Sequence, residues 1–113
     1  MFLFKRVLAA VKPAEDATDA FIVDLESNNF GGAYGLLCAS ARASYPPASF
    51  IRVAGAQPPI SDHRITGARV GTVNGRTSAT VNARLIQSDG SDVSHVFTLV
   101  KENGAWKVCG QPY

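Results

Sequence analysis

Five side chains in this sequence have the chemistry to hold or move a proton inside a pocket: Asp24, Tyr34, Asp62, His63 and His95. An imidazole or a carboxylate can act as a general acid or base, and a tyrosine hydroxyl can donate a hydrogen bond to developing negative charge. Cys38 and Cys109 add sulfur chemistry, either as thiols or as a disulfide. Which of these groups meet depends on the elements that carry them.

His95 is the most suggestive of the five. Strand alternation in "DVSHVFTLVK" puts it on the same face as Val93, Phe97 and Leu99. A polar residue on an apolar face is placed for acid–base work, makes a structural hydrogen bond, or lies near a strand end in water. Asp24 lies between Phe21 and Leu25 and could face a pocket, although helix surfaces are the usual place for aspartate.

The remaining polar groups have simpler interpretations. Tyr34 in mid-helix is expected to bury its ring and tether its hydroxyl. The run Asp62-His63-Arg64 follows two prolines and is interpreted as a solvated strand entry. The two histidines lie too far apart in the sequence for a metal-ligand spacing, and no glycine-rich phosphate loop or nucleophile elbow occurs. We therefore expect no metal and no cofactor.

The part of the chain before Ile60 is alanine-rich and favours helix. "PAEDATDAFIVDLESNN" predicts a helix that begins at Pro13, carries acidic residues in its first turns, and buries Ala17, Phe21 and Leu25. "NFGGAYGLLCASAR" predicts a second helix whose shared face holds Phe30, Ala33, Tyr34, Leu37, Cys38 and Ala41. "YPPASFIRVAGAQPP", bracketed by proline pairs, predicts a short third helix with Phe50, Ile51 and Val53.

The rest of the chain predicts an antiparallel meander. Asn74-Gly75, Asp89-Gly90 and Asn103-Gly104 are turn dipeptides, because Asn, Asp and Gly tolerate the positive φ that a type I′ turn needs. They separate four strands at about 60–73, 76–88, 92–102 and 105–111. Gly67 and Gly71 are natural places for a bend or bulge.

Alternation assigns the two faces of this sheet. One face of the second strand holds Ala79, Val81, Ala83 and Leu85. The other face, which we call the open sheet face, is predicted to hold Thr80, Asn82, Arg84, Val96, Thr98 and Val100. It mixes polar and β-branched residues, as a dimerising sheet does. Helices followed by a curved sheet indicate an α+β fold with the helices on the concave face.

The composition is that of one globular domain. The chain has 113 residues, of which 46% are apolar and 18% charged, and its net charge is +2. The eleven Lys and Arg are scattered without interleaved aromatics, so no nucleic-acid partner is expected.

Residues 1–12 are expected to form an amphipathic segment before a domain of residues 13–113. Phe4, Val7, Leu8 and Val11 follow helical spacing, and Pro13 ends or bends the helix. The apolar run is too short for a signal peptide. The segment docks on its own domain or on a second copy, or it is the edge of a membrane anchor; membrane association through residues 1–12 is left open.

This organisation resembles the NTF2-like superfamily, a cystatin-like α+β cone. Within it, the chain most resembles the small extracytoplasmic domains of unknown function in actinobacteria, particularly mycobacteria (the lumazine-binding-like group). "AFIVDLESNNFGGAYGLLCASAR" and the closing "NGAWKVCGQPY" carry the resemblance, which covers roughly residues 14–113. Two departures are Gly31-Gly32, where larger residues are usual, and the typical N-terminal anchor, which is absent or reduced to residues 1–12.

The resemblance implies a cone with two main helices and a short third on a curved four-stranded antiparallel meander. It places the second helix against the last strand, so that Cys38 and Cys109 come within disulfide distance. A disulfide implies an extracytoplasmic, secreted or membrane-peripheral location. A buried reduced pair, with a cytoplasmic location, or a catalytic thiol are the alternatives. Trp106 and Val108 should point to one face of the last strand and Cys109 to the other, which complicates the pairing.

Members of this superfamily often hold a pocket between the helices and the concave sheet face. Here the resemblance implies a ligand pocket lined by Phe21, Tyr34, Phe50, His95, Phe97 and Trp106. We expect a non-catalytic accessory domain that binds a small apolar ligand or a protein partner, with a homodimer through the open sheet face as one form. The alternative is a small isomerase or hydrolase that uses His95 or Asp24 as base with Tyr34 as donor.

Overall fold

The computed structural model describes residues 2–109, with side chains from residue 11 onward except that of Val73. Four helices come first: α1 (Phe2–Glu26), α2 (Phe30–Gly35), α3 (Ala39–Ser44) and α4 (Pro47–Ala56). Four strands follow: β1 (Ile60–Val73), β2 (Arg76–Gln87), β3 (Asp92–Glu102) and β4 (Ala105–Cys109). The α+β class and the order of helices before strands are as expected from the sequence.

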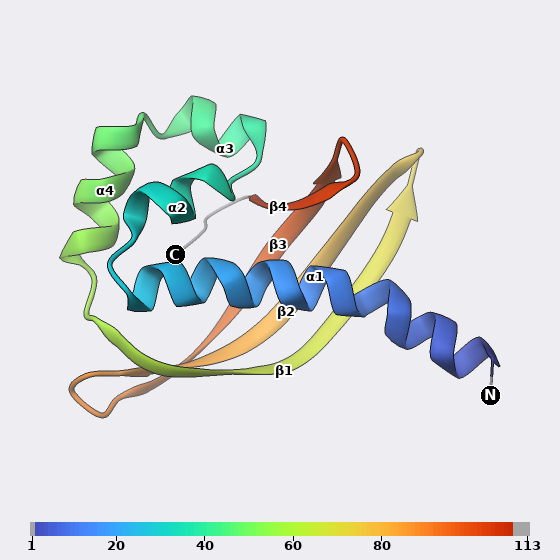
Figure 1. Ribbon diagram of the computed structural model, residues 1–113, viewed down its shortest axis with the longest axis horizontal. Coiled ribbons are helices and arrows are strands. Elements are labelled where there is room, and N and C mark those ends of the chain that lie inside the picture. Colours follow the sequence, from blue (N-terminus) through green and yellow to red (C-terminus); the bar gives the residue numbers. More distant parts are fainter. Residues whose placement is uncertain (1, 110–113) are drawn as a thin grey trace.

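The strands form one antiparallel meander in the order β1-β2-β3-β4. The sheet is strongly bent, α1 lies across its concave face, and α2, α3 and α4 gather beside one end of α1 (Figure 1). The covered face of β2 is buried at Ala79, Val81, Ala83 and Leu85, as predicted from its alternation. The predicted cone is therefore confirmed, with one long helix as its main cover.

Two of the three hairpins have the expected turn. Asn74-Gly75 and Asn103-Gly104 have positive φ at both residues, as a type I′ turn requires. The middle hairpin differs, since of Asp89-Gly90 only Gly90 has positive φ. There the Gly90 amide donates to the carbonyl of Gln87, and the Gln87 amide donates to the carbonyl of Ser91. A three-residue loop with glycine in the left-handed position therefore replaces the two-residue turn.

The first helix does not begin at Pro13, as the sequence predicted. It is continuous from Phe2 to Glu26, with Pro13 inside it, so proline here neither starts nor ends the helix. Proline has the φ of a helix but no amide hydrogen, and the ladder loses one bond at this point. The side chains of Phe4, Val7 and Leu8, which belong to the predicted apolar stripe, lie outside the described part of the chain. No helix within residues 2–109 is both long and apolar enough to cross a membrane.

The buried stripe of α1 is also shifted from the predicted one. Phe21 and Leu25 are buried as expected, but Ala17 is only half-buried. Thr18 is fully buried and donates its hydroxyl to the carbonyl of Ala14, 2.9 Å away. This hydrogen bond within the helix satisfies the threonine hydroxyl, so a polar residue can occupy a core position. The stripe that faces the sheet holds Ala14, Thr18, Phe21, Ile22 and Leu25.

The predicted second helix is two short helices, α2 and α3, separated by Leu36–Cys38. The Val108 amide donates to the carbonyl of Leu36, and the Cys38 amide donates to the carbonyl of Val108, both at 2.8 Å. Leu37 thereby forms a parallel bridge with Val108 on the outer edge of β4. The chain leaves the helix because this segment pairs with the edge strand, which would otherwise present unpaired backbone groups.

The same pairing explains how the cysteines meet. In a parallel bridge, residues one step further along both strands are neighbours on the same face. Cys38 and Cys109 stand one step beyond Leu37 and Val108, and they form a disulfide with a Cα–Cα distance of 5.2 Å. Trp106 and Val108 face the core. Cys109 therefore points to the other side of β4, and Cys38 points to that side as well, so the orientation of Cys109 does not prevent the disulfide. The expected pairing is confirmed, although a strand-like segment, not a helix, carries Cys38.

The predicted third helix is α4, and it buries only part of its expected face. Phe50 and Ala54 are buried, whereas Ile51 and Val53 are 43% and 44% exposed. Gly67 marks a bulge in β1, between Ile65 and Gly67, whereas Gly71 stays in regular register with Ser78. Of the two predicted glycines, Gly67 therefore coincides with a bulge and Gly71 does not.

We expect the double substitution Cys38→Ala with Cys109→Ala to lower the free energy of unfolding by up to about 4 kcal/mol. The reason is that the disulfide joins positions 71 residues apart in the sequence and so restricts the unfolded chain. Urea unfolding of the oxidised protein and the variant measures this difference.

Ser40→Ala is the control for this substitution. The Ser40 hydroxyl lies 3.3 Å from both sulfur atoms. Because only a weak hydrogen bond is lost, we expect an effect of about 1 kcal/mol or less. Alkylation of two thiols before reduction would contradict the pairing.

Candidate functional site

The six residues predicted to line a ligand pocket lie in or beside the core. Phe21 packs against Phe50 and Phe97 with ring centroids 6.5 and 6.0 Å apart, and all three are at most 3% exposed. The Tyr34 ring contacts Phe50 and the His95 ring contacts Phe97, with centroid separations of 5.6 and 4.5 Å. The five rings form a continuous row. Trp106 is buried on β4, with the Lys101 ammonium 5.8 Å from its ring. The row of rings runs from α2 and α4 through Phe21 of α1 to β3.

The predicted acid–base residues Asp24, Tyr34 and His95 each contact a different residue and do not contact one another in the hydrogen bonds and ring contacts described below. The Tyr34 hydroxyl donates to the carbonyl of Arg42, 3.1 Å away. Asp24 is half-buried at the end of α1, where it accepts a hydrogen bond from the Asn29 side chain at 3.3 Å. His95 is half-buried beside Phe97 on β3. Of the four hollows described on residues 11–109, none is lined by Asp24, Tyr34 or His95.

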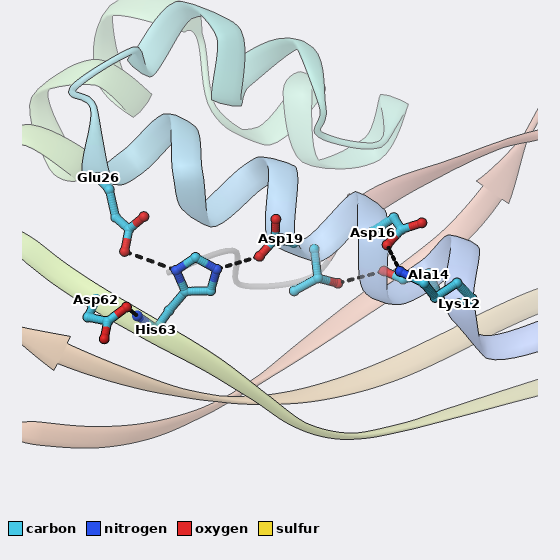
Figure 2. A network of polar contacts seen from close by, with 8 residues as sticks. Lys12, Ala14, Asp16, Asp19, Glu26, Asp62 and His63 are labelled. Carbon is cyan, nitrogen blue, oxygen red and sulfur yellow. Dashed lines mark hydrogen bonds and ion pairs between the residues drawn. The ribbon is translucent and has the colours of Figure 1, made fainter. Parts of the chain in front are cut away.

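His63, which the sequence placed in a solvated strand entry, lies instead between two carboxylates of α1. Its Nδ1 is 2.9 Å from Glu26 Oε2, and its Nε2 is 2.5 Å from Asp19 Oδ1 (Figure 2). The imidazole is 13% exposed and Glu26 is 20% exposed, whereas Asp19 is 52% exposed. This cluster joins α1 to β1 through charged groups at the margin of the core.

A bulge in β1 decides where His63 points. Strict alternation from the buried Ile60 would turn His63 to the open sheet face, but the register shifts between Ile60 and Asp62. His63 then pairs with the buried Leu85 and faces α1. The spacing of Asp19 and Glu26, two helical turns apart, was the available sequence signal. Without the bulge, strand alternation puts His63 on the opposite face, so the sequence offers Asp19 and Glu26 no histidine to contact.

The cluster shifts the pKa of His63 in a definite direction. Burial acts to lower this pKa, but the hydrogen bonds to Asp19 and Glu26 and their negative charges outweigh burial, so the pKa is raised. The protonated imidazole bridges both carboxylates as a double donor. The cluster thus stabilises the contact between α1 and β1 most when His63 is charged.

The same groups also have a metal-ligating arrangement. Ligand atoms of Glu26, Asp62 and His63 all lie within 4.8 Å of one another. The Asp62 carboxylate accepts the His63 backbone amide at 2.8 Å, which holds it next to the His63 backbone (Figure 2). Spacing along the chain does not reveal this set, because its members come from two elements that meet only in the fold.

The open sheet face is the second candidate site. Thr80, Asn82, Arg84, Val96 and Thr98 are exposed on it, whereas Val100 is half-buried. The strand register adds Arg64 beside Arg84 and Arg69 beside Thr80. Val96, at 57%, is the most exposed large apolar side chain among residues 11–109 with a described side chain. The face is therefore uncharged around Thr80, Asn82, Val96 and Thr98. Its charged groups are the arginines of β1 and the Arg84–Asp92 ion pair toward one end.

Comparison with solved structures shows the fold. A putative NTF2-like transpeptidase from Campylobacter jejuni superposes with a TM-score of 0.65 at 17% sequence identity, over 87% of this chain and 98% of that one. Aln2 from a Streptomyces species superposes with a TM-score of 0.54 at 17% identity, over 85% and 82% of the two chains. No family model matches the sequence, and no curated protein is similar to it. The chain has the NTF2-like fold that the sequence resemblance implied.

The raised pKa of His63 predicts a pH dependence of stability. A group with a raised folded pKa stabilises fully below its unfolded pKa, about 6.5, and the effect is lost as pH rises through the folded pKa. We expect the free energy of unfolding to fall by roughly 0.5–1 kcal/mol between about pH 6 and pH 9, a small effect because Asp19 is exposed to solvent. Urea unfolding at both pH values, with a chelator present, measures it.

His63→Gln should remove this fall, because the amide cannot be charged. His95→Gln is the matched control, since it removes the other histidine and leaves the cluster intact. An equal pH dependence in His63→Gln and the unmodified protein would show that the cluster does not contribute.

Proposed function

We propose that this chain is a non-catalytic accessory domain with the NTF2-like fold that associates with a second copy of itself through the open sheet face. The observation that carries the proposal is the exposure of Val96 in the middle of an uncharged strip, while the aromatic residues of the interior pack against one another. The surface of the sheet, more than the interior, is then the part available for binding.

The separation of the acid–base residues supports a non-catalytic role. A general base and an oxyanion donor must reach one reacting group at about 3 Å. Tyr34 instead donates to a backbone carbonyl, and Asp24 accepts from Asn29. The isomerase or hydrolase alternative is therefore not favoured. Nor do we carry over the transpeptidase name of the Campylobacter protein, because acyl transfer needs an activated nucleophile and Cys38 and Cys109 are bonded to each other.

The chemistry of the open sheet face is that of a modest protein interface. Interface centres are depleted of charge and rims are polar. Here Thr80, Asn82, Val96 and Thr98 form the uncharged middle, and arginines lie toward β1. The strands have 14, 12, 11 and 5 residues. At about 3.3 Å per residue and about 4.8 Å between strands, the sheet offers an area on the order of 700 Å². A standard interface uses about 800 Å² per partner, so a second copy is an occupant of suitable size.

The disulfide supports an extracytoplasmic location, because such bonds persist mainly in oxidising compartments. A small apolar ligand is the second candidate occupant, since Tyr34, Phe50, Phe21, Phe97 and His95 form a continuous row that a ligand could separate. The kinship with the actinobacterial lumazine-binding-like group and membrane association through residues 1–12 stay predictions.

Val96→Asp tests the dimer. A carboxylate desolvated at the centre of the interface would weaken association by at least about tenfold. Sedimentation equilibrium over a range of protein concentrations measures the dissociation constant. We expect a monomer–dimer equilibrium for the unmodified chain and a monomer for Val96→Asp.

Val53→Asp is the matched control, because Val53 is similarly exposed but lies on α4, away from the sheet. It should dimerise like the unmodified chain. A monomeric unmodified protein at every concentration, or equal weakening by both substitutions, would refute association through the open sheet face.

A further inference from the structure

The cluster around His63 contains side chains that can ligate a metal, and their ligand atoms lie close together. We propose that Glu26, Asp62 and His63 bind a divalent cation of the zinc type, and that Asp19 is the positioning residue that orients the imidazole. The site lies where α1 meets β1, and its entrance reaches the edge of the open sheet face at Arg64 and Arg84.

The distances suit an ion held by these three side chains. Zinc binds nitrogen and carboxylate oxygen at about 2.0–2.2 Å, so neighbouring ligand atoms in a tetrahedral site lie about 3.3–3.6 Å apart. Here Nδ1 of His63 is 2.9 Å from Glu26 Oε2, and the ligand atoms of all three residues lie within 4.8 Å. Side-chain adjustments of about 1 Å bring them to coordination distance, with the fourth position left to water.

Asp19 supplies what a ligating histidine needs on its other nitrogen. Metal-bound imidazoles usually donate their second ring N–H to a carboxylate, which fixes the tautomer and the ring orientation. His63 Nε2 lies 2.5 Å from Asp19 Oδ1, so this nitrogen donates to Asp19 and Nδ1 faces Glu26 (Figure 2). The ring is held in this orientation by α1 and β1 together.

The ligand set selects the class of metal. Imidazole suits zinc and its transition-metal neighbours, whereas calcium prefers six to eight oxygen ligands and magnesium keeps an octahedral shell of oxygens. Three carboxylates around one imidazole concentrate negative charge in a chain whose net charge is +2. A divalent cation compensates this charge better than one proton does.

The ion has a route to the site. Asp62 and His63 line an open hollow of about 370 Å³, together with Arg64, Arg84, Ile86 and Asp92. Arg84 donates to Asp92 at 3.0 Å, so its positive charge is partly compensated within the hollow. Water and a hydrated cation can therefore approach Asp62 and His63 from solvent.

Titration of the untagged, oxidised protein with ZnCl₂ after chelator treatment tests the site by calorimetry. We expect saturable binding of one zinc ion per chain. Glu26→Gln and His63→Gln should each weaken binding at least about tenfold, and Asp19→Asn about 10- to 100-fold, the range for a lost outer carboxylate. Mg²⁺ and Ca²⁺ should not compete. Cobalt(II) in place of zinc should give the strong visible absorption of a four-coordinate nitrogen–oxygen site.

Asp16→Asn and His95→Gln are the controls. Asp16 is an exposed carboxylate on the same helix, paired with Lys12, and His95 is the other histidine. Both variants should bind zinc like the unmodified protein. Circular dichroism of each variant checks folding, and cobalt absorption of the unmodified protein tests the site without any substitution. Absence of zinc binding, or unchanged affinity in a folded His63→Gln variant, would overturn the proposal.

Discussion

The pairing of Leu36–Cys38 with the edge of β4 is the constraint on which the rest of the fold depends. It interrupts one helix-favouring segment, satisfies backbone groups on an edge strand, and brings the two cysteines into register. Glu102 adds to the same corner by accepting the Ala39 amide at the start of α3. The helical half of the chain is thus joined to the last strand by hydrogen bonds and by a covalent bond.

The second determinant is the irregularity of β1. Its two register shifts change which residues face α1, and the first of them turns His63 toward Asp19 and Glu26. A bulge costs little backbone pairing, yet it moves a side chain to the other face of a sheet. The polar cluster that results is the one place in residues 11–109 where imidazole and several carboxylates converge. The candidate metal chemistry therefore rests on a single extra residue in a strand.

The interior and the surface of the sheet have different roles in this protein. The concave face is covered by α1, whose Phe21 contacts rings from α4 and β3, and this packing supports the fold. The opposite face carries exposed β-branched residues beside arginines and is open to a partner. A fold shared with proteins of such low sequence identity says nothing by itself about activity, so the function must be argued from these surfaces.

The sequence by itself determined the elements whose signals are local. Asn-Gly turns with alternating residues between them specified the meander, and apolar periodicity specified the helices, because turn geometry and side-chain periodicity depend on neighbours along the chain. The middle loop, the unbroken α1 through Pro13 and the strand-like Leu36–Cys38 did not follow from such signals. They depend on contacts between distant segments. The orientation of His63 was decided by tertiary structure alone, since a bulge reverses alternation and its partners lie 37 and 44 residues away.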